Sequence, residues 1–243
     1  MYGCFGGYDL NQIDIAPTIA EIFRIPFKAD GKAFKEIVEY AKNSNKIIML
    51  IIDSFGYLSY LKSRKIFQNI SKMNFDGRLF RCKSNSDKTT PAIASILCGR
   101  KPEIHRIYQT GDVYKSYLKS ILEVASEQGI KSSVIMEKEG ALTFKGKVDI
   151  IKPIMDDKNI IKFDRDTKES TIEILKGDSR LIISHLRALD KLSYTYKAIK
   201  FVDNLVFEIY RICKINSLII LCGDHPPHES KECSVPLIVN KVI

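Results

Sequence analysis

The stretch SLIILCGDHPPH, residues 217–228, is the part of the sequence that says most about the fold. An apolar, β-branched run of strand length ends in Asp224 and His225, and two prolines then stiffen the turn before His228. Nearly continuous apolar runs of this length are typical of strands that are buried on both faces of a parallel sheet. The stretch therefore predicts a central strand that ends in polar side chains.

Five further runs of the same kind are spread along the chain: KIIMLIID (46–53), GRLFRC (77–82), KSSVIM (131–136), RLIISHL (180–186) and VPLIVN (235–240). Helix-length amphipathic stretches lie between them, at 31–44, 113–129 and 194–214. The alternation predicts an α/β fold, a three-layer α/β/α sandwich with a mainly parallel sheet.

The length of 243 residues favours a single domain, residues 1–243. Hydrophobic residues make up 45% of the chain and charged residues 28%, which excludes disordered, collagen-like and coiled-coil proteins. Residues 137–174 show the least regular pattern, and we interpret them as an insertion or a cap over the site.

The formal net charge of +9 is compatible with an anionic partner. The lysines are spread along the chain without a basic block, which disfavours nucleic acid as a partner, and we infer no function from charge alone. No run reaches the ~18 apolar residues that span a bilayer, and the N-terminus lacks the features of a signal peptide. We therefore expect no membrane partner, a cytoplasmic location, and reduced thiols for the six scattered cysteines.

Two strand ends carry candidate metal ligands. In open parallel sheets, ligands bind beyond the carboxyl ends of the strands. Asp53 closes one apolar run and is followed by a turn, although an aspartate in this place is also typical of the N-cap of the next helix. Asp224 and His225 offer an oxygen and a nitrogen donor side by side, a combination that zinc, manganese and iron accept.

A third candidate lies at Thr89 and Thr90, directly before Pro91. Proline is favoured at the first position of a helix, and Gly99 follows the helical stretch. A hydroxyl at a helix N-terminus faces free backbone N–H groups, which suits a nucleophile that attacks a phosphate. By spacing alone, two threonines that merely cap the helix are the simpler interpretation.

Together these segments resemble the alkaline phosphatase superfamily, which includes type I phosphodiesterases and cofactor-independent phosphoglycerate mutases. The nucleophile of that superfamily lies two residues before a proline, and a small-residue helix, a glycine and P-x-x-H follow. The stretch from Thr89 through Gly99 and Pro102 to His105 matches this order. The match selects Thr89 over Thr90 as the nucleophile, and a threonine in this position disfavours a sulfatase.

The resemblance implies a metal site. Asp53, Asp224 and His225 would hold one divalent ion, zinc or manganese, with the Thr89 hydroxyl as a further ligand. Superfamily members normally bind a second ion through a D-x-x-G-H segment and a distant histidine. Here Asp190 fits that segment, but Tyr194 stands where its histidine is expected, and the other candidate ligands are His228 and, as a replacement, His185. One ion or two are therefore expected.

The segment QIDIAPTIAEIFRIP, residues 12–26, resembles an element that follows the V-P-L-I strand near the C-terminus of these enzymes. In this chain the V-P-L-I strand comes last, so residues 1–30 read as a segment moved by circular permutation.

The resemblance implies a phosphomonoester or phosphodiester hydrolase with Thr89 as its nucleophile, which acts on a small anionic phosphorylated substrate. Two alternatives stay open. One is phosphoryl transfer of the phosphoglycerate mutase kind, and the other is a non-enzymatic relative whose second metal site has degenerated at Tyr194.

Overall fold

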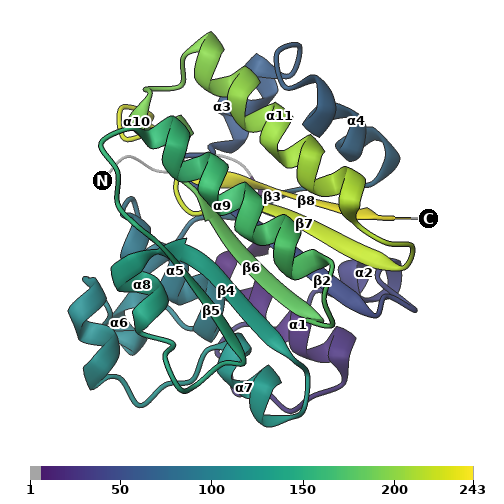
Figure 1. Cartoon of the computed structure of the whole chain (residues 1–243), viewed down its shortest axis with the longest axis vertical. Helices are drawn as coiled ribbons and strands as arrows, with labels where there is room; N and C mark the ends of the chain where they lie inside the picture. The colour runs from purple at the N-terminus through teal and green to yellow at the C-terminus, as the bar shows by residue number, and fades with distance from the viewer. Residues whose placement is uncertain (1–6, 243) are drawn as a thin grey trace.

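The computed structural model describes residues 7–242, and its centre is an eight-stranded sheet in the order β1-β3-β8-β7-β2-β6-β4-β5 (Figure 1). β8 runs antiparallel to both of its neighbours, and the other pairings are parallel. The strands are β1 Leu10–Asn11, β2 Lys46–Ile52, β3 Arg78–Lys83, β4 Ser132–Glu137, β5 Ile150–Ile154, β6 Leu181–Leu186, β7 Ser217–Gly223 and β8 Ser234–Lys241.

Helices cover both faces of this sheet, which confirms the predicted α/β/α sandwich. One face packs against α1 Ile15–Phe23, α2 Lys35–Tyr40, α5 Thr89–Cys98, α7 Ile121–Glu127 and α8 Lys138–Leu142. The other face packs against α3 Tyr57–Ser63, α4 Gln68–Asp76, α9 Ile160–Leu175, α10 Ala188–Lys191 and α11 Tyr196–Ile212. In Figure 1, α9 and α11 cross in front of the sheet.

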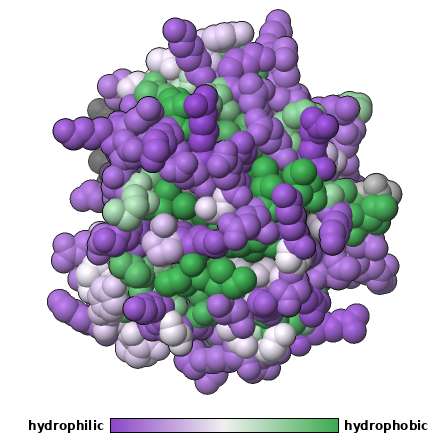
Figure 2. Space-filling model, viewed as in Figure 1, coloured by the Kyte–Doolittle hydropathy of each residue, from purple (hydrophilic) through white to green (hydrophobic). Residues whose placement is uncertain are grey.

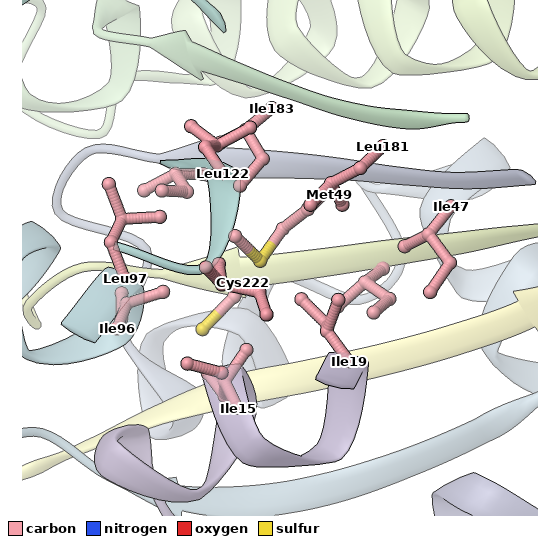
Figure 3. Close-up of a cluster of buried hydrophobic side chains, with 14 of the residues drawn as sticks. Ile15, Ile19, Ile47, Met49, Ile96, Leu97, Leu122, Leu181, Ile183 and Cys222 are labelled. Carbon is pink, nitrogen blue, oxygen red and sulfur yellow. The ribbon is translucent and has the colours of Figure 1, made fainter. Parts of the chain in front are cut away.

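Strand β2 shows why the central runs are apolar without interruption. Its odd-numbered residues from Ile47 to Ile51 join the core under α1, and its even-numbered residues from Ile48 to Ile52 join the core under α11. Side chains alternate between the faces of a strand, so a strand that is covered twice needs an apolar residue at every position. Figure 3 shows Ile47 and Met49 on the first of these faces.

Helix α1 lies against the strands at the end of the chain. Ile15 and Ile19 border a small space together with Ile220 of β7 and Leu237 of β8, and Figure 3 shows both isoleucines near Cys222 of β7. The N-terminal segment thus packs beside the V-P-L-I strand. The circular permutation itself stays a prediction.

The predicted helix at 113–129 is wrong in its first half. Residues Thr110–Lys115 form a 3-10 helix, and α7 begins only at Ile121. Ser120 starts α7 because its Oγ accepts from the Glu123 N–H at 3.2 Å, while the Glu123 carboxylate accepts from the Ser120 N–H at 2.7 Å. This reciprocal capping box fixes the helix start and was not read from the sequence.

Residues 137–174, predicted as an insertion or cap, contain α8, β5 and most of α9. β5 pairs parallel with β4 and forms one edge of the sheet. Its Pro153 has no N–H to donate, which suits an edge strand. This segment therefore extends the sheet.

The described cysteines include four free thiols, at Cys82, Cys98, Cys213 and Cys222. Cys233 is disulfide-bonded, so the expectation of a reduced thiol is wrong for this residue; Cys4 lies outside the described residues. Disulfides are typical of oxidising compartments. The predicted cytoplasmic location gains no support from this bond and stays a prediction.

Figure 2 shows a mainly hydrophilic surface on which hydrophobic residues gather in separate areas. Among residues 7–242, no helix is both long and apolar enough to cross a membrane.

Asp164 of α9 holds the loop that leads to Asp190. Its two carboxylate oxygens accept from the N–H groups of Arg187 at 2.8 Å and of Ala188 at 2.9 Å. Burial raises the pKa of Asp164 to about 6, although both N–H groups lower it. The ordinary value of 3.8 applies to the unfolded chain, so the native state binds the proton more tightly.

A pH dependence of stability follows from this raised pKa. The contribution of Asp164 to the free energy of unfolding is present below the ordinary value and is lost as the pH rises through 6. Relative to Asp164→Asn, the wild type should lose about 2 kcal/mol of unfolding free energy between pH 4.5 and pH 7. Urea denaturation of both proteins at several pH values measures the difference, and parallel pH profiles would show that the assigned shift is wrong.

Candidate metal centre and nucleophile

Ser54 joins three parts of the site. It follows Asp53 with a φ of 59°, in the left-handed region that non-glycine residues rarely adopt. Its N–H donates to Asp224 Oδ1 at 3.0 Å, and its hydroxyl donates to Asp190 Oδ1 at 2.7 Å. The strained turn thus ties the end of β2 to the end of β7 and to α10. Sequence reasoning missed Ser54, because a positive φ leaves no signal at a serine.

Gly223 lets these strand ends come close. A Cβ at this position would lie 2.1 Å from the carbonyl oxygen of Phe55. The close backbone approach therefore requires glycine, and it brings Asp224 beside Asp53.

Asp53, Asp224 and His225 form the candidate metal site. One donor atom from each lies within 4.8 Å of the others. His225 Nε2 is 3.2 Å from Asp53 Oδ1 and 3.6 Å from Asp224 Oδ2, and the three residues are at most 2% exposed. Neither of these carboxylate oxygens has a hydrogen-bond partner. Because buried charges of one sign are costly without compensation, this donor set fits a divalent cation.

The pKa values of Asp224 and His225 reflect the two buried carboxylates that share this cluster. Burial and the neighbouring Asp53 carboxylate raise the pKa of Asp224 to about 7. Burial lowers the pKa of His225, but Asp53 and Asp224 outweigh it and raise that pKa to about 9. A cation would have to displace these protons, so we expect its affinity to increase with pH.

The ring of His225 is oriented for coordination. Its Nδ1 lies 2.9 Å from the carbonyl oxygen of Pro226. A proton on Nδ1 donates to that carbonyl and leaves the Nε2 lone pair directed at the two carboxylates, which is the usual arrangement of a metal-binding histidine.

Thr89 is the first residue of α5, and its Oγ1 lies 3.2 Å from His225 Nε2. Pro91 falls in the first turn of this helix, and Gly99 ends it with a φ of 65°. The structure therefore brings the predicted nucleophile to the predicted metal ligands. Its catalytic role stays a prediction.

A second histidine faces Asp53 from the other side. His185 Nε2 lies 3.9 Å from Asp53 Oδ2 and has no hydrogen-bond partner. Its Nδ1 is 3.4 Å from Glu137 Oε2 at the end of β4. Burial lowers the pKa of His185, but Glu137 and Asp53 raise it to about 9. Sequence reasoning considered His185 and missed Glu137, which an apolar strand pattern does not distinguish.

Asp190 and His228 also come together, as predicted for a second ion. Asp190 Oδ1 lies 3.4 Å from His228 Nε2, and Asp190 Oδ2 lies 3.0 Å from Lys191 Nζ. The His228 ring is 4.7 Å from the His225 ring, between centroids. The His228 side chain is 59% exposed, so this pair lies at the outer edge of the buried cluster.

Tyr194 belongs neither to the buried metal cluster nor to the pair of Asp190 and His228. Its φ is 57°, and its ring packs edge-on against Phe67 at 6.2 Å within the core. Burial raises the pKa of its hydroxyl well above the ordinary value. The position where the family pattern expects a histidine is here a partly buried aromatic residue that packs against the core.

His105 is separate from the cluster and joins two helices. Its Nε2 lies 3.1 Å from Ser95 Oγ of α5, and its Nδ1 accepts from the Ile107 N–H at 2.9 Å. Nε2 thus connects α5 to α6 Pro102–His105, and Nδ1 holds the backbone directly after α6.

No protein-family model matches the chain, and no curated protein matches it. Solved structures do. A protein in the alkaline phosphatase superfamily from Vibrio parahaemolyticus has a TM-score of 0.64 at 14% identity, over 82% of this chain and 60% of the other. Phosphonoacetate hydrolase from Sinorhizobium meliloti has a TM-score of 0.62 at 12% identity, over 82% and 59%.

The C-terminal periplasmic domain of EptC from Escherichia coli, solved in complex with zinc, has a TM-score of 0.62 at 14% identity, over 90% of this chain and 76% of the other. The chain spans about three fifths of the length of the first two of these structures. The chain has the fold of the alkaline phosphatase superfamily.

Proposed function

We propose that the chain is a metal-dependent phosphoester hydrolase with Thr89 as its nucleophile. The observation that carries the proposal is the placement of Thr89 Oγ1, 3.2 Å from His225 Nε2, at a buried cluster with two partnerless carboxylate oxygens. The similar structures support a metal-binding hydrolase, since one is a phosphonoacetate hydrolase and another was solved in complex with zinc.

The residues that would hold the metal follow from the cluster. Asp53, Asp224 and His225 are the ligands that we propose for one ion, zinc or manganese, with the Thr89 hydroxyl beside them. When bound, such an ion polarises a phosphoryl oxygen and favours the ionised form of a neighbouring hydroxyl. Asp190 and His228 are the ligands that we propose for a second ion.

The protein's own part in the reaction is nucleophilic catalysis. Thr89 Oγ1 loses its proton and forms a bond to phosphorus while the bond from phosphorus to the leaving oxygen breaks, and that oxygen takes up a proton as the alcohol departs. Water then cleaves the phosphothreonine, which releases phosphate from a monoester substrate or a phosphomonoester from a diester substrate. The free N–H groups at the start of α5 face negative charge that collects next to Thr89.

The test is an assay of purified, metal-loaded protein on an aryl phosphate and a bis-aryl phosphate. Hydrolysis of either is the expected result, and the lack of both would reject the proposal. Interconversion of phosphoglycerate isomers would instead identify a mutase. About one bound metal per chain without any phosphoesterase activity would identify a non-enzymatic relative.

His185 and Glu137 give a prediction about metal affinity. Because His185 offers an unpartnered Nε2 to the second oxygen of Asp53 and Glu137 orients its ring, His185→Gln should weaken zinc binding about 10- to 100-fold. Glu137→Gln should act in the same direction. The double variant should lose little more, since both residues act through one contact.

Calorimetric titration with zinc measures these affinities. His105→Gln is the matched control, because His105 is equally buried but bonds Ser95 away from the cluster, and its zinc affinity should stay within about three-fold of the wild type. An unchanged zinc affinity in His185→Gln would remove His185 from the site.

A further inference from the structure

A cavity of about 90 Å³ begins at Thr89 and follows one face of α5. Thr89, Ile93 and Leu97 line it at successive helical turns. The opposite walls come from the segment after α6, from β4 and from α8, with Ile107, Met136 and Phe144 as their main apolar side chains. The cavity therefore starts at the proposed nucleophile and continues between apolar walls.

One wall of this cavity is linked to the metal cluster. Glu137 forms part of its wall, and the Glu137 carboxylate contacts His185, which faces Asp53. A molecule whose phosphoryl group lies at Thr89 would thus have its organic group beside this wall.

Besides Thr89, Thr90 and Thr110, the lining has four polar side chains, and all four are bonded within the protein. Thr143 Oγ1 donates to the Gly140 carbonyl at 2.7 Å. Ser120 and Glu123 bond each other across the start of α7, and Glu137 is held by His185. They leave few free partners for the hydroxyl groups of a ligand, and two of them are carboxylates that repel an anionic group.

From this cavity we infer that the substrate is a phosphoester of an apolar alcohol, with an alkyl chain of about four carbon atoms. The inference rests on the proposed function and deepens it. The phosphoryl group lies at Thr89, and the apolar group fills the space along Ile93 and Leu97.

Polar phosphoesters fit this cavity poorly. The hydroxyl and carboxylate groups of a phosphoglycerate or a sugar phosphate would lose their water without gaining partners. Each buried methylene of an alkyl chain instead gains roughly 0.8 kcal/mol of transfer free energy, about four-fold in affinity. Affinity should therefore increase with chain length until the cavity is full.

Alkylphosphonates test this inference, because their carbon–phosphorus bond replaces the ester oxygen and the compounds serve as inhibitors. We expect the inhibition constant of butylphosphonate to be about 10- to 50-fold lower than that of methylphosphonate. In Ala94→Leu, which places a larger side chain into the cavity, this ratio should fall below about three-fold. Ala33→Leu, an equal change outside the cavity, should keep the wild-type ratio.

Circular dichroism and thermal melting establish that both variants are folded. The two proposals fail in different ways. Hydrolysis of aryl phosphates with equal inhibition constants for all alkylphosphonates would overturn the apolar cavity and keep the hydrolase. Chain-length-dependent binding in calorimetry, without hydrolysis of any phosphoester, would overturn the hydrolase and keep the cavity.

Discussion

Replacing Thr89 with alanine is expected to lower kcat for an aryl phosphate by about 10³-fold or more. The variant loses the only atom of this side chain that approaches His225, the Oγ1 at 3.2 Å. A nucleophile acts in the chemical step, so the loss should appear in kcat, while KM should change little. Steady-state kinetics at saturating metal measure both constants.

Thr90→Ala is the matched control, because Thr90 follows directly in the first turn of α5. Its kcat should fall by less than about ten-fold. Equal losses in the two variants would show that the helix start, rather than the Thr89 hydroxyl, matters for activity. An unchanged kcat in Thr89→Ala would exclude Thr89 as the nucleophile.

The second large effect concerns the metal. A divalent ion at one hundred times its Kd should raise the melting temperature by about 5 to 10 °C, because it binds only the folded chain. The cluster predicts this gain, since Asp53 Oδ1 and Asp224 Oδ2 are buried without hydrogen-bond partners. Removal of the ion with a chelator should reverse the gain and abolish hydrolysis.

Asp53→Asn should lose most of this thermal shift together with the activity. Thr89→Ala should keep most of the shift, which separates metal binding from nucleophilic attack. Asp76→Asn, which changes an exposed carboxylate at the end of α4, should melt and respond to metal like the wild type. An equal thermal shift in Asp53→Asn and in the wild type would place the metal elsewhere.

Much of the fold could be predicted from the sequence because the central strands are covered on both sides. The runs that contain β2 and β7 are apolar at nearly every position, which is typical of strands that are covered on both faces. The edge strands were harder to predict from the sequence. β1 has two residues and β5 contains Pro153, so neither gives a strand pattern.

The candidate site could be predicted where it depends on strand ends. Asp53 and Asp224 follow adjacent parallel strands, and the pairing of β2 with β7 brings them together. The position of Thr89 close to these strand ends could be predicted only from the family pattern. α5 follows β3, which pairs antiparallel with β8, and no local sequence signal predicts this pairing.

The remaining contacts depend on packing between distant segments. Glu137 meets His185 only because β4 pairs with β6 in a particular register, with Ser132 beside Leu181. The Thr89 cavity depends on residues from α5, from β4 and from the segment 140–144 together. Neither arrangement leaves a pattern within one segment, so the sequence alone could not predict them.

Peptide mass spectrometry of metal-loaded protein, quenched in acid during turnover of an aryl phosphate, tests the role of Thr89 most directly. We expect one phosphoryl group on the peptide that carries Thr89 and Thr90, located on Thr89 by fragmentation, and none on that peptide in Thr89→Ala. A phosphoryl group on Thr90, or steady turnover without any phosphorylated peptide, would contradict a phosphothreonine at Thr89.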